Sequence, residues 1–270
     1  MYRIVTLGDS ATYGALVPYN ETYSYALQEI LRDDYGYSQV EVVNGGVTGY
    51  ASWNMLVDLA FRIPVLQPDL VIVYQGWNDL EARERSPDCY SDPSPFLGLD
   101  PRRELRVQPT ELSPSALYRF LAINFGWMPN PGAESIPLVN SEIGCSAQDL
   151  SEIAENIAAN PPIYFERNTR EMIGIARTLG FRIMLMTWAY DVNSDQMRPY
   201  RVPAIAEHNA ITARIAEEND VLFLDYAAVA PSDESDWRDT AHMSAQGNRS
   251  FAHTIARYLV DQQVIPAPPG

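Results

Sequence analysis

The chain has 270 residues and a formal net charge of −16 at pH 7, from 35 acidic and 19 basic residues. Because so negative a chain repels phosphate groups, we expect it to bind neither nucleic acid nor anionic lipid surfaces. A membrane-spanning helix needs about 20 apolar residues, and the apolar runs are far shorter, so the sequence predicts no membrane span.

Cysteine and histidine are scarce. The two cysteines, Cys89 and Cys145, are too few for a disulfide scaffold or a cysteine-built zinc site. The sequence leaves open whether they form a single disulfide, which would indicate an exported enzyme. Because no basic and apolar leader opens the chain, a cytoplasmic location is the default expectation.

Apolar runs and helical spacing alternate along the first third of the chain. They predict a strand at 3–7, a helix at 21–33, a strand at 40–43, a helix at 53–63 and a strand at 70–74. Gly8 after the first strand and Pro64 after the second helix are typical terminators.

The alternation then breaks from about residue 80 to residue 163. This segment contains many prolines and both cysteines but no strand pattern, and it is too long for an ordinary loop. Helical spacing is expected only at 115–125 and 147–158. We therefore predict a single domain over residues 1–270 with an inserted cap or lid after the third strand.

Helices and strands alternate again after this insertion. The pattern predicts a helix at 164–179 with Gly180 as its C-cap, a strand at 182–187, a helix at 204–219, a strand at 221–224 and a helix at 244–260. Apolar strands that alternate with helices predict a parallel sheet covered on both faces. Such sheets bind ligands beyond the carboxyl ends of their strands.

Three residues near those strand ends suit nucleophilic catalysis. Ser10 follows the first strand, and Asp239 precedes His242 by three positions in the segment after the fifth strand. At this spacing the carboxylate could hold imidazole Nδ1–H and leave Nε2 free to take the serine proton. Taken alone, each residue type is more often structural, Ser10 as a helix cap and His242 as a surface residue.

Hydrogen-bond donors follow the second and third strands. Gly46 lies in the glycine-rich stretch 44–49, where a backbone N–H can approach a ligand, and Asn78 offers a side-chain amide. With the backbone N–H of Ser10, these donors could form an oxyanion hole. A plain turn at Gly46 and an Asx-turn at Asn78 are the alternatives.

These pieces occur in a fixed order along the chain. The blocks are Gly8-Asp9-Ser10, Asn44-x-Gly46-x-x-Gly49, Gly76-x-Asn78-Asp79 and Asp239-x-x-His242. In this combination the sequence resembles the SGNH hydrolases, the GDSL family of serine esterases and lipases. The G-x-S-x-G elbow of the α/β-hydrolases is absent around Ser10.

The resemblance implies a flavodoxin-like three-layer α/β/α sandwich with a five-stranded parallel sheet. It implies Ser10 as the nucleophile, His242 as the general base and then acid, and Asp239 as the residue that orients His242. The backbone N–H groups of Ser10 and Gly46 and the Asn78 amide would form the oxyanion hole, without any metal or cofactor. Asp9 and Asp79, in the same blocks, are expected to be structural.

The expected activity is hydrolysis of carboxylic esters with a small or medium acyl group, including acetyl groups on carbohydrate. An acyltransferase on the same residues, a lipase or lysophospholipase acting on longer chains, and a non-catalytic carbohydrate-binding module are the alternatives. Trp77, Tyr50 and Trp188 near strand ends are candidate substrate contacts, although aromatic residues there could also pack in the core. His208 and His253 lie in predicted helices and are expected to be structural.

Overall fold

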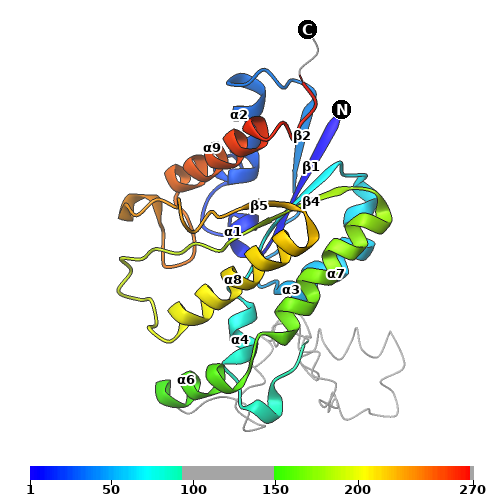
Figure 1. Cartoon of the computed structure of the whole chain (residues 1–270). Coiled ribbons are helices and arrows are strands. Elements are labelled where there is room, and N and C mark those ends of the chain that lie inside the picture. Colours follow the sequence, from blue (N-terminus) through cyan, green and yellow to red (C-terminus); the bar gives the residue numbers. More distant parts are fainter. Residues whose placement is uncertain (93–148, 268–270) are drawn as a thin grey trace, which may run out of the picture.

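A computed structural model of the chain describes residues 1–92 and 149–267. Its centre is a five-stranded sheet in the order β2-β1-β3-β4-β5, and every neighbouring pair is parallel (Figure 1). The strands are β1 (Tyr2–Gly8), β2 (Val40–Asn44), β3 (Leu70–Tyr74), β4 (Arg182–Met186) and β5 (Leu222–Leu224). This is the flavodoxin-like strand order, and the predicted fold class is confirmed.

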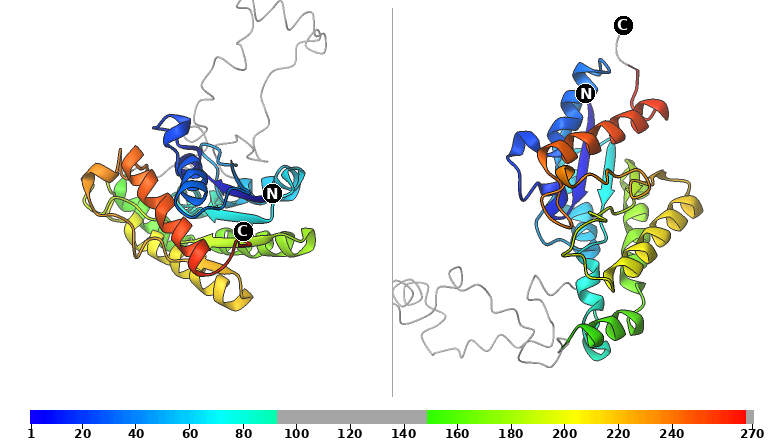
Figure 2. Two further views of the ribbon diagram at one scale, coloured as in Figure 1. Left: turned by 90° about the horizontal axis from the view of Figure 1, so that it is seen from above. Right: turned by 90° about the vertical axis from the view of Figure 1, so that its left-hand side faces the viewer.

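Helices cover both faces of the sheet (Figures 1 and 2). One layer consists of α2 (Tyr23–Asp33) and α9 (Ala245–Asp261), and the other of α3 (Ser52–Phe61), α7 (Ile163–Leu179) and α8 (Arg201–Asn219). Two apolar clusters result, one on each face. All of β3 is buried between them, which explains its uninterrupted apolar sequence.

Among the described residues, three further α-helices lie close to the carboxyl ends of the strands or beyond them. The short helices α1 (Ser10–Tyr13) and α4 (Asp79–Arg83) were not predicted, and α6 (Leu150–Ala159) corresponds to the helix predicted at 147–158. The helix predicted at 115–125 and Cys145 lie outside the described residues. Cys89 is disulfide-bonded.

Local capping sets several helix ends. Gly180 follows α7 with φ of 81°, in the left-handed conformation expected of a C-cap glycine. Ser244, predicted to be helical, is instead the N-cap of α9, because its side chain accepts the N–H of Gly247. Helix α8 begins three residues earlier than predicted, since Pro203 is tolerated in a first turn.

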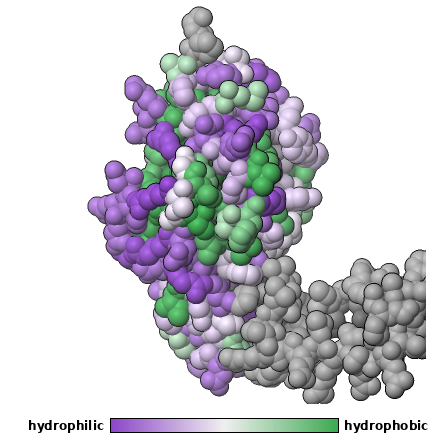
Figure 3. All heavy atoms as spheres, turned by 90° about the vertical axis from the view of Figure 1, so that its right-hand side faces the viewer, coloured by the Kyte–Doolittle hydropathy of each residue, from purple (hydrophilic) through white to green (hydrophobic). Residues whose placement is uncertain are grey.

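None of the helices within residues 1–92 and 149–267 is both long and apolar enough to cross a membrane. The face shown in Figure 3 has hydrophobic side chains at its centre among hydrophilic ones. Exposed apolar residues such as Phe61 and Val65 are common on globular proteins, so they assign no partner by themselves.

Candidate active site

Ser10 lies where β1 turns directly into α1. A Cβ on Gly8 would lie 2.0 Å from the hydroxyl oxygen of Thr12 and 2.7 Å from the carbonyl oxygen of Tyr74. Only glycine therefore allows so tight a turn at the end of the strand. Asp9 caps α1 by accepting the N–H of Ala11, which leaves the hydroxyl of Ser10 free for other contacts.

The structure brings Ser10, His242 and Asp239 into one hydrogen-bonded chain. Nε2 of His242 lies 2.8 Å from Oγ of Ser10, and Nδ1 lies 2.9 Å from each carboxylate oxygen of Asp239. Since Asp239 accepts a hydrogen bond from Nδ1–H, Nε2 is left as the acceptor for the serine hydroxyl. This arrangement can activate a serine as a nucleophile.

The loop before α9 holds the carboxylate and the imidazole in place. One oxygen of Asp239 accepts the backbone N–H groups of Ala241 and His242, each at 2.8 Å. An antiparallel bridge between Trp237 and Met243 closes the loop. Both catalytic candidates in this loop are therefore oriented before any substrate arrives.

The electrostatics of the pair favour a charged Asp239 and a basic His242. The hydrogen bond to Asp239 raises the pKa of His242 above its ordinary 6.5, against an opposing effect of burial. Partial burial raises the pKa of Asp239, but hydrogen bonds from His242 and from two backbone N–H groups outweigh it and lower that pKa overall. Asp239 is thus ionised throughout the range in which His242 titrates.

A second carboxyl group, that of Asp9, also influences His242. Asp9 is only 1% exposed, and its Oδ2 has no hydrogen-bond partner among the described residues. Burial raises the pKa of Asp9 to about 7, with Asp79 adding to the rise and the Ala11 N–H and His242 opposing it. In return, the charge of Asp9 contributes to the raised pKa of His242.

We expect an acidic limb in the pH dependence of kcat/KM, with its midpoint above pH 6.5, because only neutral His242 can take the serine proton. The variant Asp9→Asn keeps the helix cap but removes the charge, so the pKa of His242 should fall and the limb should move to lower pH. Rates of p-nitrophenyl acetate hydrolysis between about pH 4 and pH 9 measure this midpoint. An unchanged midpoint in the variant would contradict the electrostatic role of Asp9.

Two of the candidate oxyanion donors keep an N–H group available for a ligand. As the first residue of α1, Ser10 has a backbone N–H for which the helix itself offers no acceptor. Nδ2 of Asn78 donates to the carbonyl oxygen of Tyr50 at 2.9 Å, which fixes the amide and leaves its second N–H available. Asn78 is 6% exposed, so this donor would act in a nearly water-free position.

Gly46 is placed differently from the sequence-based expectation. Its N–H donates to Oδ1 of Asn44 at 2.9 Å, while Nδ2 of Asn44 donates to the carbonyl oxygen of Thr12 at 2.8 Å. A Cβ on Gly46 would lie only 2.3 Å from the backbone nitrogen of Tyr13, so glycine is needed for the loop to approach α1. Gly46 thus packs against α1, and its N–H already has an acceptor.

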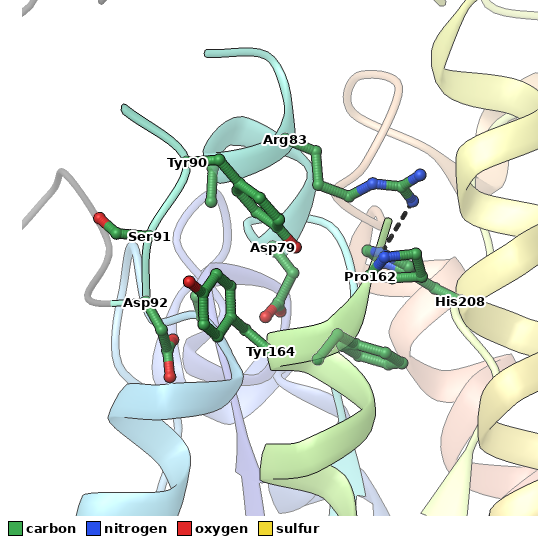
Figure 4. A pocket seen from close by; sticks show the side chains of 11 residues that line it. Asp79, Arg83, Tyr90, Ser91, Asp92, Pro162, Tyr164 and His208 are labelled. Atoms are coloured by element: carbon green, nitrogen blue, oxygen red, sulfur yellow. Dashed lines mark hydrogen bonds between the residues drawn. The ribbon is translucent and has the colours of Figure 1, made fainter. Parts of the chain in front are cut away.

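Asp79 supports the turn that carries Asn78. Its carboxylate accepts the backbone N–H and the hydroxyl of Ser52, the latter at 2.5 Å, and burial raises its pKa to about 6. The Ser52 hydroxyl in turn accepts a hydrogen bond from Asn168 at 3.0 Å. Figure 4 shows Asp79 pointing into a small pocket whose wall also carries Tyr90 and Asp92.

His208 supports the same turn from α8. Its Nδ1 lies 3.1 Å from the carbonyl oxygen of Gly76, and its Nε2 lies 3.3 Å from Nη1 of Arg83 (Figure 4). Burial and the charge of Arg83 lower the pKa of His208 to about 3, so it is neutral and donates to Gly76. The expected structural role of His208 thus includes fixing the glycine two residues before Asn78. His253, on α9, is exposed.

The three aromatic residues predicted to contact the substrate lie in different environments. Trp188 is only 1% exposed and stacks on Tyr74 with ring centroids 4.3 Å apart, so it is a core residue rather than a substrate contact. Tyr50 is half-buried and acts on Asn78 through its backbone carbonyl. Trp77 lies in the wall of a pocket beside His242.

This pocket has a volume of about 350 Å³ and opens beside the hydrogen-bonded chain. Residues 239–242 form one side. The other side consists of Trp77, Glu81, Gln196, Arg198 and Arg201. Sequence reasoning missed the four polar residues of that side, because they lie on helices and a connecting loop rather than directly at strand ends.

The sequence profile of the GDSL-like Lipase/Acylhydrolase family matches residues 6–250. The chain belongs to this family. The resemblance read from the four sequence blocks is thereby confirmed, and the chain is a carboxylic ester hydrolase, a class in which a catalytic triad and an oxyanion hole are typical. Among curated proteins none matches the sequence.

Solved structures share the fold at low sequence identity. The lipase/acylhydrolase from Enterococcus faecalis is 17% identical, with a TM-score of 0.56 and 97% of each chain covered. A variant of Axe2, an acetyl xylan esterase from Geobacillus stearothermophilus, is 18% identical, with a TM-score of 0.55 and coverage of 96% of this chain and 94% of that one. The acetyl xylan esterase AlAXEase is 14% identical, with a TM-score of 0.55 and coverage of 97% and 100%.

Within the part of the chain that the structure describes, no group of three or more acidic, histidine or cysteine side chains could share a metal ion.

Proposed function

We propose that the esterase acts through an acyl-enzyme on Ser10, with His242 as general base and then acid and with Asp239 as the residue that orients it. The continuous hydrogen-bonded chain from Asp239 through His242 to Ser10 supports these roles. The domain assignment belongs to the same proposal: one domain over residues 1–270, interrupted at about 80–163. Strands β3 and β4, on either side of that interruption, pair in one sheet.

In the first half of the reaction, Nε2 of His242 takes the proton of Ser10 as Oγ attacks the ester carbonyl carbon. The carbonyl oxygen becomes an oxyanion, which the Ser10 N–H and the Asn78 amide would stabilise. Gly46 would join them once its N–H is shared with, or released from, Asn44. His242 then protonates the leaving alcohol.

In the second half, His242 removes a proton from water, which attacks the acyl-enzyme at the same carbonyl carbon. The same donors hold the second oxyanion, and collapse of this intermediate returns the proton to Ser10 and releases the acid. Asp239 remains ionised and stabilises the imidazolium in both halves.

We further propose a short acyl group, with acetyl esters of carbohydrate as the preferred class. The pocket beside His242 is lined largely by charged and polar side chains, which suits the hydroxyl-bearing alcohol part of a sugar ester better than an apolar group. Acetyl xylan esterases are among the solved structures that share the fold, and they support this class without fixing it.

A series of p-nitrophenyl esters tests this proposal. We expect kcat/KM to be highest for acetyl or butyryl and to fall by roughly tenfold or more at octanoyl and palmitoyl, as in an esterase whose site takes only a short acyl group. Turnover by wild-type protein but not by Ser10→Ala would support the serine mechanism. An optimum at palmitoyl would contradict the short-acyl proposal and favour a lipase.

The same assay, with an alcohol or sugar acceptor added, distinguishes hydrolysis from acyl transfer. A hydrolase releases free acid at a rate that does not depend on the acceptor. Accumulation of a transferred ester in place of acid would favour the acyltransferase that uses the same residues.

A further inference from the structure

Arg201 is held rigidly in the wall of the pocket beside His242. Its Nε donates to Glu84 at 2.5 Å, and its guanidinium carbon lies 4.9 Å from the ring centroid of Trp77. The Arg201 side chain is 11% exposed. A guanidinium stacked on an aromatic ring and paired at one nitrogen loses little further freedom on binding a ligand.

Within the described part of the chain, two side chains of this pocket wall, Arg201 and Glu81, have polar atoms without a hydrogen-bond partner. In residues 1–92 and 149–267, neither terminal nitrogen of Arg201 has an acceptor, and the Glu81 carboxylate has no donor. Burial raises the pKa of Glu81, and the positive charge of Arg201 opposes this rise. The two side chains are therefore close enough to interact electrostatically. Both side chains line the pocket, so a ligand bound there can take up this hydrogen-bonding capacity.

The charges around the pocket indicate what kind of ligand fits. Arg198 and Arg201 are offset by Glu81 and Glu84, so this wall is close to neutral although the whole chain is strongly acidic. A neutral wall with both a donor fork and a carboxylate acceptor suits neighbouring hydroxyl groups, which donate and accept at the same time. An anionic group would meet the Glu81 carboxylate, and an acyl chain would leave the charges unpaired.

We propose that Glu81 and Arg201 form a subsite for a vicinal diol on the alcohol part of the ester. Glu81 accepts from one hydroxyl group, and the terminal nitrogens of Arg201 donate to its neighbour. Trp77 supports Arg201, because the guanidinium group lies over its ring. Because the pocket also borders His242, a diol bound there lies beside the group that protonates the leaving alcohol.

This inference rests on the proposed function, so its test compares two acetyl esters. One is an acetylated methyl pyranoside, which carries free hydroxyl groups, and the other is p-nitrophenyl acetate, which carries no diol. In Glu81→Gln and Arg201→Gln, we expect the ratio of kcat/KM for the first ester over the second to fall by roughly tenfold to a hundredfold. The matched control is Asp195→Asn, an exposed acidic residue next to Gln196, which should leave the ratio unchanged.

A binding measurement does not depend on turnover. Calorimetry with unacetylated methyl pyranoside should give weaker binding for Glu81→Gln and Arg201→Gln in a Ser10→Ala background than for Ser10→Ala alone. Equal binding, or a rate ratio within about twofold of wild type, would overturn the subsite. Preference for an acidic pyranoside over a neutral one would also overturn it, in favour of an anion site. Failure of the proposed function is distinct, because it appears as Ser10-independent hydrolysis of p-nitrophenyl acetate.

Discussion

Replacing Ser10 with alanine should reduce kcat for p-nitrophenyl acetate by at least roughly 10⁴-fold. The change removes only Oγ, the atom that lies 2.8 Å from Nε2 of His242. It should not unfold the protein, because α1 is capped by Asp9 rather than by Ser10. Steady-state kinetics and thermal unfolding, measured on the same preparation, check both expectations.

The matched control is Ser250→Ala, an exposed serine on α9 that is not among the residues lining the pocket beside His242, which should keep full activity. The double variant of Ser10→Ala with His242→Ala should lose about as much activity as Ser10→Ala alone, because residues that act as one unit are not additive. Retention of most of the wild-type rate by Ser10→Ala would exclude the acyl-enzyme on this serine.

The layered fold could be predicted because each strand carries its own burial signal. Leu70–Tyr74 is apolar at every position and is buried at every position, as expected for a central parallel strand. The predicted helix ends were less accurate where a side-chain hydrogen bond determines the end. Ser244 fits a helical pattern by composition, yet its hydroxyl accepts the N–H of Gly247 and makes it the cap.

The close approach of Ser10 and His242 could be anticipated for a topological reason. The segments that follow parallel strands meet at one edge of the sheet, so positions 232 residues apart can be expected to lie together. Asp239 is adjacent for a local reason, since a tight loop brings residues three apart face to face.

The orientations and tertiary contacts of individual side chains and N–H groups could not be predicted from the sequence. The sequence places Gly46 near the site but does not reveal that Asn44 accepts its N–H. Trp188 follows a strand like the site residues do, yet it stacks on Tyr74 inside the core. Glu81 and Arg201 come together only because α4 and the start of α8 meet at the pocket, a tertiary contact that leaves no trace in local spacing.

Replacing Asp239 with asparagine should reduce kcat by roughly 10² to 10⁴-fold while leaving the fold intact. An asparagine oxygen can still accept the N–H groups of Ala241 and His242, so the loop should keep its shape. The amide group, however, would donate to Nδ1 of His242. The imidazole would then carry its proton on Nε2 and could not accept one from Ser10.

The pH dependence separates this explanation from a loss of structure. Asp239 is the main cause of the raised pKa of His242, so the acidic limb of kcat/KM should move to lower pH in Asp239→Asn as the plateau falls. The matched control is Asp233→Asn, an exposed residue of the same loop whose oxygen accepts the N–H of Ser235; it should change neither the limb nor the plateau. A lower plateau with an unmoved limb would mean that Asp239 acts on the shape of the loop rather than on the proton of His242.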